Sequence, residues 1–342
     1  MKIWFDILTP KQYLFFEYFI QKLRKQHKII STSRKYEQVN GIRKFGSINP
    51  IIIGKHGGKN NTTKLLASLK RSLLLTKKIE KTSPDLLISF CSPEASRVAF
   101  GLGIPHIAFS DSPHAKAVMR LSLPYVTKLL TPWIIPKNDF KEFGINSRNI
   151  IQYRAIDAGI IIKNYKKTRQ KKTGTQKTIL IRPEESEAAY INKESNTMKI
   201  IGSVVEKFPN EKKIILSRYK AQSNEIKRKF GRDVYIVSKP VNGKDLLDNV
   251  DCFIGSGGTM TAEAGLLGIP TISLNAVPNR IEDFLVKNKI IVRSESPNRI
   301  SREITQSLND PQIIKKRKQT ARKFVTSFED PYQVLLRTIH AL

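Results

Sequence analysis

The sequence has few of the residues that mark several common classes of protein. Cysteine occurs only twice, at Cys91 and Cys252, which argues against a disulfide framework and favours small core residues in a reducing compartment. Histidine occurs five times without zinc-site spacing, so no metal is expected. No apolar run approaches the roughly 20 residues of a membrane helix, and the N-terminal MKIWFDILTPKQ does not resemble a signal peptide. We therefore expect a cytoplasmic protein.

Acidic residues are also scarce. The chain has 29 Asp and Glu against 60 Lys and Arg, a formal net charge of +31 that is spread over both halves. Such a charge favours phosphate groups, nucleotides, nucleic acid or an anionic membrane surface as partners, but it also fits a merely solvated, lysine-rich surface. Because the basic segment 313–324 (IIKKRKQTARKF) has no recognition-helix, zinc-finger or RNA-binding signature beside it, nucleic acid is not the expected partner.

Short apolar runs alternate with helical patterns along the whole chain, which predicts parallel strands joined by helices. The expected strands are residues 2–8, 28–32, 50–54, 85–90, 106–110 and 128–131, then 178–182, 213–217, 234–237, 252–256, 271–274 and 290–292. Thr62 or Thr63 is expected to cap the long helix after the third strand. The polar, basic residues 163–177 interrupt this order and are interpreted as a linker or exposed loop. With 342 residues, the chain is expected to form two Rossmann-like, doubly wound α/β domains.

Two similar segments occur, one in each half of the chain: SPEASRVAFGLGIPHIAF at 92–109 and SGGTMTAEAGLLGIPTISL at 256–274. We interpret both as one strand–turn–helix–strand unit in which Gly-Ile-Pro ends the helix. Only the second turn is rich in glycine. Gly257 and Gly258 would let an anion approach the helix N-terminus, and Ser256 and Thr259 would add hydroxyl donors.

Glu263 lies about one helical turn beyond that glycine-rich turn. A carboxylate at this distance would reach past a diphosphate, so we expect it to bind ribose hydroxyls. The alternative is that the glycines only permit tight packing and that Glu263 is a solvated helix residue.

The segment VDCFIGSGGTMTAEAGLLGIPTISL resembles the C-terminal nucleotide-sugar motif of glycosyltransferase-B proteins, notably the peptidoglycan N-acetylglucosaminyl transferase and the non-hydrolysing UDP-N-acetylglucosamine 2-epimerases. Ser256, Gly257, Glu263, Gly268 and Pro270 match the spacing of the transferase motif. The resemblance implies that the turn binds the UDP diphosphate and Glu263 the ribose. The upstream KPVNGKDLLDNVD resembles the segment that packs against the base, which implies contacts from Val241 and Leu246.

The whole chain is similar to an archaeal and bacterial family of unknown function. The segments that carry this similarity are WFDILTPKQ, GKHGG, the segment 92–109 and the residues that follow it, LTPWIIPK and the glycine-rich turn. The resemblance to glycosyltransferase-B proteins implies domains at 1–157 for the acceptor and at 158–330 for the nucleotide sugar, facing across a cleft. Chains of this fold usually end in a helix that crosses back to the first domain. Residues 331–342 fit such a helix, with Val334, Leu335 and Ile339 near one face; the alternative is a helix packed wholly on the second domain.

Candidates for chemistry in the first domain follow its predicted strands. Asp111 could orient His114 as a base for an acceptor hydroxyl, although Asp111 would also suit a helix N-cap. His56 stands on the glycine loop GKHGG. Where the transferase has a glycine-rich loop with a histidine, this chain has Leu8-Thr9-Pro10-Lys11, so Thr9 and Lys11 are candidates for holding a phosphate. Glu94 would contact sugar hydroxyls or simply favour the first turn of a helix.

In the second domain, Arg182 and Arg218 end predicted strands and could grip phosphate, or be two surface arginines among many. Glu187 is interpreted as an ordinary helix residue. The segment 118–137, which contains Trp133, mixes apolar and basic residues; we interpret most of it as core, with a peripheral membrane patch as the alternative.

Together with these observations, the resemblance to glycosyltransferase-B proteins implies a UDP-sugar-dependent, metal-independent glycosyltransferase that needs no cofactor. A UDP-sugar 2-epimerase or hydrolase at the same site is the second interpretation. A non-catalytic nucleotide- or nucleic-acid-binding protein is the third.

Overall fold

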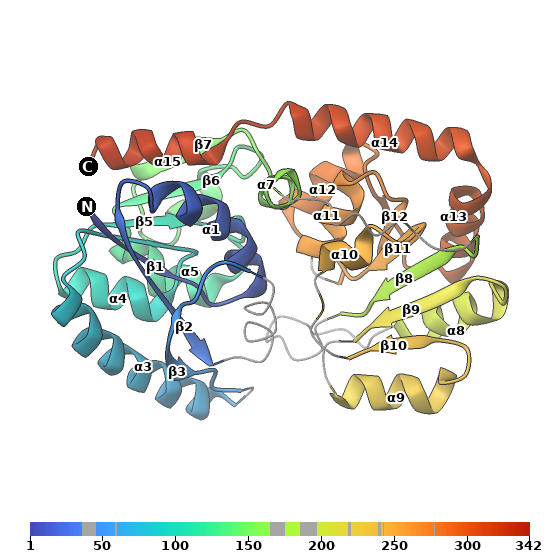
Figure 1. Ribbon diagram of the computed structural model, residues 1–342, viewed down its shortest axis with the longest axis horizontal. Helices are drawn as coiled ribbons and strands as arrows, with labels where there is room; N and C mark the ends of the chain where they lie inside the picture. Colours follow the sequence, from blue (N-terminus) through green and yellow to red (C-terminus); the bar gives the residue numbers. More distant parts are fainter. Residues whose placement is uncertain are drawn as a thin grey trace. The chain divides into compact units, whose positions relative to one another are not determined.

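The computed structural model describes residues 1–35, 46–58, 60–164, 175–184, 197–217, 220–238, 241, 243–276 and 278–342. The chain forms two compact units. The first comprises Met1–Asp157 and Glu329–Leu342, and the second comprises Ala158–Phe328. Figure 1 follows the chain through both units, from blue at the N-terminus to red at the C-terminus.

The first unit is built on a parallel sheet. Its strands, in sheet order, are β3 (Ile51–Lys55), β2 (Lys28–Lys35), β1 (Lys2–Asp6), β4 (Leu86–Ser89), β5 (His106–Phe109), β6 (Lys128–Pro132) and β7 (Ile150–Tyr153). Its helices are α1 (Pro10–Leu23), α3 (Asn61–Thr82), α4 (Pro93–Gly101), α5 (Lys116–Ser122), η1 (Leu123–Tyr125), α6 (Asn138–Lys141), η2 (Ser147–Asn149) and α15 (Pro331–His340). Helix α7 (Asp157–Lys163) begins at the last residue of this unit's first segment.

Neighbouring residues of β1 point to opposite faces of this sheet, and each face has its own core. Trp4 belongs to a cluster with Leu75 and Ile79 of α3 and Ala95 of α4. Phe5 instead contacts α1, where its ring lies 5.2 Å from that of Phe16. This two-sided burial is the reason that the strand reads as a continuous apolar run.

The second unit repeats this plan. Its parallel strands, in sheet order, are β10 (Tyr235–Val237), β9 (Lys212–Leu216), β8 (Thr178–Arg182), β11 (Cys252–Gly255), β12 (Thr271–Ser273) and β13 (Val292–Arg293). Its helices are α8 (Thr197–Lys207), α9 (Lys220–Phe230), α10 (Gly243–Leu247), α11 (Thr259–Leu266), α12 (Arg280–Lys287), α13 (Pro297–Asn309) and α14 (Pro311–Thr326).

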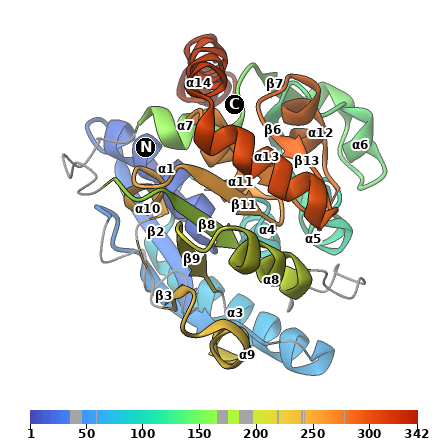
Figure 2. The ribbon, with the colours of Figure 1, turned by 90° about the vertical axis from the view of Figure 1, so that its right-hand side faces the viewer.

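The core of the second unit also lies on both faces of its sheet. Ile179 and Ile181 of β8 join a cluster with residues of α8, α9 and α13, whereas Leu180 between them joins residues of α10 and α11 on the other face. Helices α8 and α13 pack side by side (Figure 2). The predicted fold class, two doubly wound parallel α/β domains, is confirmed.

The structure corrects several local predictions. Strand β7 was not predicted from the sequence. The long helix α3 is capped by Asn60, whose side chain accepts a hydrogen bond from the Thr63 backbone N–H, and not by Thr62 or Thr63. Asp111 is not an N-cap, because α5 begins at Lys116 and no side chain caps it. Most apolar residues of segment 118–137 are buried, in agreement with its interpretation as core.

The Gly-Ile-Pro prediction is correct in both units. Helix α4 is followed by Gly103 with φ 69°, and α11 by Gly268 with φ 77°. Both glycines adopt the left-handed conformation that ends a helix. The environments differ, because a side chain on Gly268 would meet the Lys318 backbone of α14, whereas nothing lies near the corresponding position on Gly103.

Helix α15 packs on α1 within the first unit. The Tyr18 hydroxyl donates a hydrogen bond to Asp330 at 2.5 Å, and the ring of Phe19 lies 6.1 Å from that of Tyr332. Val334 and Leu335 are buried. Within the described ranges, no helix combines the length and apolarity needed to cross a membrane.

Candidate functional site

The order of strands in the second unit creates a switch point between β8 and β11. The chain proceeds from β8 to β9 and β10 on one side, then continues through β11, β12 and β13 on the other. Arg182 at the end of β8 pairs in register with Gly255 at the end of β11. Ligands of open parallel sheets bind outside the carboxyl ends of strands at such a point.

The glycine-rich turn lies at this switch point. Gly257 and Gly258 have φ values of 99° and 82°, a conformation that favours glycine, and Gly258 is the residue before α11. No side chain of the described residues caps α11. Its first N–H groups and partial positive charge are therefore directed out of the helix without a capping acceptor from a side chain.

In the corresponding turn of the first unit, a side chain caps the helix that follows. There, the Ser92 hydroxyl accepts a hydrogen bond from the Ala95 N–H at 3.5 Å, and Pro93 occupies the first helical turn, where it has no N–H to offer. Cys91 takes the left-handed conformation, with φ 48°, but its thiol is buried and its pKa is raised by burial to about 12. Among the described residues, the helix after the first of the two repeated turns has a side-chain cap and the helix after the second has none.

Glu282 of α12 explains why residue 257 is glycine. A Cβ on Gly257 would lie 2.7 Å from Oε2 of Glu282. Glu282 is 3% exposed; its Oε1 accepts hydrogen bonds from the Ser273 hydroxyl at 2.7 Å and from Arg293 at 3.1 Å. Its Oε2 has no hydrogen-bond partner within the part of the chain that the structure describes. Burial raises the pKa of Glu282, although Ser273 and Arg293 oppose the shift.

The other predicted residues of the second unit lie in varied surroundings. Glu263 is buried on α11, at 5% exposure. Arg182 donates a hydrogen bond to the Leu216 carbonyl at 3.2 Å. Val241 and Leu246 pack against the core cluster that contains Leu180.

Two of the residues named from the sequence cannot be placed. Arg218 and Glu187 lie outside the described residues.

The two hydroxyl residues of the glycine-rich turn are both described. Ser256 is buried and directly follows β11, and Thr259 is the first residue of α11.

The first unit brings together a cluster of charged residues from three elements. Lys11, in the first turn of α1, forms ion pairs with Asp111, which follows β5, and with Asp157 at 2.9 Å. The Tyr153 hydroxyl donates a hydrogen bond to the other oxygen of Asp157 at 2.5 Å, and the Ser112 hydroxyl donates to Asp111 at 2.8 Å. The sequence did not point to Tyr153, the last residue of the unpredicted strand β7, or to Asp157, the first residue of α7.

Burial and ion pairing shift the pKa values of the three ionisable groups in this Lys11 cluster. Burial alone would lower the pKa of Lys11, but the two carboxylates outweigh it and raise the pKa. Burial would likewise raise the pKa of Asp111, yet Lys11 holds that pKa below its usual value. At Asp157 burial dominates and raises the pKa. The ammonium of Lys11 is thus shared by two acids, which leaves it less charge to offer a phosphate.

His114 lies near the Lys11 cluster. Desolvation lowers the pKa of the His114 imidazole, Asp111 raises it, and Lys11 lowers it, with a net decrease. His56 accepts a hydrogen bond at Nδ1 from the Gly58 N–H at 3.1 Å on an exposed loop. Thr9 is the N-cap of α1 and accepts a hydrogen bond from the Gln12 N–H.

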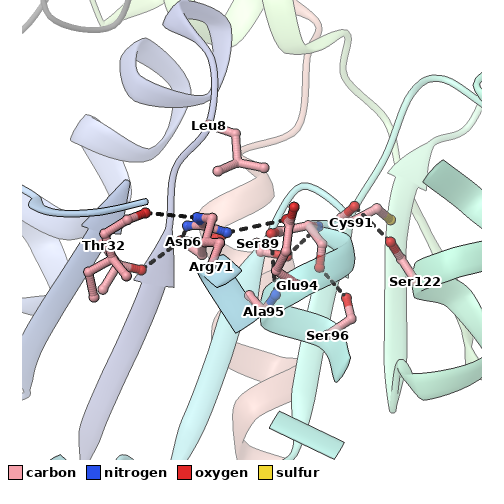
Figure 3. Close-up of polar contacts among 12 residues, drawn as sticks. Asp6, Leu8, Thr32, Arg71, Ser89, Cys91, Glu94, Ala95, Ser96 and Ser122 are labelled. Carbon is pink, nitrogen blue, oxygen red and sulfur yellow. Dashed lines mark hydrogen bonds and ion pairs between the residues drawn. The ribbon is translucent and has the colours of Figure 1, made fainter. Parts of the chain in front are cut away.

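A second charged network lies at the switch point between β1 and β4 of the first unit (Figure 3). Arg71 of α3 is 1% exposed and pairs with Asp6 at 2.6 Å and Glu94 at 3.3 Å. Thr32 donates a hydrogen bond to Asp6 at 2.6 Å. Glu94 is thus both a first-turn residue of α4 and the buried partner of an arginine that the sequence did not single out.

The described residues contain no group of three or more His, Cys, Asp and Glu side chains that could hold a metal ion. The two cysteines are buried and unpaired with each other, and burial raises the pKa of Cys252 to about 12.

Comparison with solved structures identifies the fold. A UDP-GlcNAc 2-epimerase from Neisseria meningitidis, bound to UDP-GlcNAc, is similar with a TM-score of 0.75, at 17% identity and 100% coverage of both chains. A spinosyn rhamnosyltransferase complexed with spinosyn aglycone has a TM-score of 0.60, at 13% identity, with 99% of this chain and 100% of that chain covered. The protein has the glycosyltransferase-B fold of two parallel-sheet α/β domains, as the sequence resemblance implied.

The family follows from the sequence itself. The chain belongs to the family described as protein of unknown function (DUF354), whose model matches residues 1–341. An uncharacterized protein of Methanocaldococcus jannaschii is 30% identical over 290 residues, which cover 80% of this chain and 81% of that protein.

Proposed function

We propose that this protein is an enzyme acting on a nucleotide diphosphate sugar, with a UDP-sugar as donor in a glycosyl transfer. The observation that carries the proposal is the uncapped glycine-rich turn before α11 at the switch point of the second unit. Consecutive left-handed glycines leave backbone N–H groups and a helix N-terminus available to an anion, which is the chemistry that a diphosphate requires.

In this proposal the second unit binds the donor. The diphosphate would be held by the backbone of Gly257, Gly258 and Thr259, with help from Arg182. Glu263 would bind the ribose once a local rearrangement exposes its buried carboxylate, and Val241 and Leu246 would contact the base. No metal or other cofactor is needed, because the helix N-terminus would stabilise the charge on the leaving diphosphate.

The first unit would supply the base. In a transfer, the acceptor hydroxyl gives its proton to the base while its oxygen bonds to the anomeric carbon. The bond from that carbon to the diphosphate breaks, and UDP leaves. His114 suits the base, because the lowered pKa of its imidazole favours the neutral ring and the Asp111 carboxylate would stabilise the ring once protonated. His56 is the other candidate.

Calorimetry with UDP, UDP-sugars, ADP and inorganic phosphate tests the proposal. UDP should bind more tightly than phosphate, and Gly258→Val should weaken UDP binding by about 10- to 100-fold, because the side chain would project where the phosphate sits. Gly103→Val is the matched control, since both glycines are left-handed with open space at Cβ. Equal UDP affinity in the Gly258 variant and the wild type would reject the site.

Epimerisation or hydrolysis of a UDP-sugar is the second candidate, favoured by the TM-score of 0.75 to a UDP-GlcNAc 2-epimerase. Incubation with UDP-GlcNAc separates the three reactions. Transfer releases UDP only when an acceptor is present, hydrolysis releases it without one, and epimerisation changes C2 with no UDP released.

The charge of +31 favours the third candidate, a non-catalytic nucleotide or nucleic-acid binder. Such binding should weaken steeply with salt and survive Gly258→Val. Binding to the proposed site should fail in that variant at any salt concentration.

A further inference from the structure

The outer face of α3 carries a row of exposed leucines. Leu65 and Leu66 are each 60% exposed, Leu69 is 59% and Leu73 is 58% exposed. Single exposed leucines are ordinary on protein surfaces, but a contiguous apolar patch marks an interaction site. Four leucines within three turns of one helix form such a patch.

The spacing of the residues shows that α3 has a buried face and, separately, an exposed row of leucines. Arg71, Leu75 and Ile79 recur every four residues and are buried against the first unit. Leu66, Leu69 and Leu73 recur at three and four residues, which places them on the opposite side of the helix. The core of the first unit therefore does not account for these leucines.

Basic residues flank the leucine row. Lys70, Lys77 and Lys81 are exposed and lie on the same outer side of α3, one or two turns apart. Glu80 is the single acidic residue of the helix. Long lysine side chains beside leucines can hold their charges outward while their stems cover apolar surface.

Within the described part of the first unit, α3 makes its contacts through its other side. The helix packs on α4 and on β3, and β3 is the edge strand of its sheet (Figure 1). Ile51 of β3 is itself 44% exposed. The apolar and basic surface thus lies at the margin of the first unit.

We propose that the outer face of α3 attaches the protein to an anionic phospholipid surface. An amphipathic helix with leucines and lysines on its free side buries the leucines at the level of the headgroups, and the lysines pair with lipid phosphates. The net charge of +31 adds a long-range attraction to the same surface. This inference does not depend on the proposed reaction.

Charge also argues against a second copy of the chain as the occupant. A symmetric contact of α3 with its counterpart would bring two rows of lysines together, with Glu80 as the one acid available on each helix. An anionic bilayer satisfies both the leucines and the lysines.

Sedimentation of the full chain with vesicles tests this inference. Vesicles of phosphatidylcholine mixed with phosphatidylglycerol should bind the protein, and phosphatidylcholine alone should not. Replacing Leu66, Leu69 and Leu73 together by Gln should lower binding to the anionic vesicles by at least about tenfold, with no loss of fold because these side chains are exposed. Replacing Lys70, Lys77 and Lys81 by Gln should lower it by about 100-fold.

The matched control variant removes three positive charges from a different helix. Lys315, Lys316 and Lys323 are exposed on the basic helix α14, and their replacement by Gln should reduce binding much less than the α3 lysine variant. An equal loss in the control would show a diffuse charge effect and overturn the proposal. So would unchanged vesicle binding by the leucine variant, or a wild-type dimer that the leucine variant converts to monomer.

Discussion

At the scale of single residues, Lys11 joins two acidic side chains of the first unit. One of these acids, Asp157, is 1% exposed. Lys11→Met should cost about 3–5 kcal/mol of unfolding free energy at neutral pH, because it removes the cation that pairs with two largely buried carboxyl groups. Chemical denaturation of the variant measures this cost.

The pH dependence of the Lys11 variant provides a second check. Lys11 depresses the pKa of Asp111, so this stabilisation is present above the unfolded pKa and is lost as pH falls through the folded pKa. The gap between wild type and variant should therefore shrink in acid. Lys116→Met, at an exposed position on α5, should change stability by less than about 0.5 kcal/mol. A gap that stays constant with pH would contradict the ion-pair explanation.

Glu282 has the opposite pH behaviour. Its pKa is raised in the folded protein above the usual 4.5, so its contribution is fully present below that pH and is lost as pH rises through the folded pKa. Glu282→Gln keeps an oxygen for Ser273 and Arg293 but does not titrate. The variant should therefore gain stability relative to wild type as pH rises from 4.5 towards neutrality, as measured by urea denaturation. The same change at the exposed Glu295 should show no such trend.

At the scale of secondary structure, the two Gly-Ile-Pro units offer a matched comparison. Gly103→Ala should cost about 1–2 kcal/mol, because alanine must adopt a left-handed conformation in otherwise open space. Gly268→Ala has the same backbone cost, and its Cβ would also lie 2.7 Å from the Lys318 Cα of α14. Overpacking should add about 1–3 kcal/mol. Equal losses in thermal denaturation would mean that α14 moves aside freely.

The helices and strands also show which parts of the structure could be predicted from sequence patterns. Apolar runs and glycine signals predicted the two parallel sheets and the turn before α11, because these depend on residues close together in the chain. The strand β7 was missed, since Ile150–Tyr153 is short and a glutamine interrupts its apolar pattern. The pairing of Lys11 with Asp157 depends on how the folded sheet assembles, which no local pattern records. Glu282 behind Gly257 was missed for the same reason.

At the scale of the whole molecule, the chain passes between its two units twice, after Asp157 and after Phe328. The second passage returns α15 to α1. Removal of residues 329–342 should expose Tyr18 and Phe19 and lower the hydrogen-exchange protection of α1, while that of β11 is retained. Arg337→Ala breaks only an exposed ion pair with Glu329 and should leave both unchanged. Equal loss of protection in α1 and β11 would show that the two units unfold together.

The return of α15 to the first unit also has a consequence during synthesis. Residues 1–157 leave the ribosome first. The aromatic side chains of α1 that contact Tyr332 are covered only after residues 329–342 have been synthesised. The second unit, continuous in the chain, has all its residues before the first unit does. The nascent N-terminal half must therefore keep an unfinished apolar surface in the cell until translation of the second unit ends, and chaperone capture should map to α1.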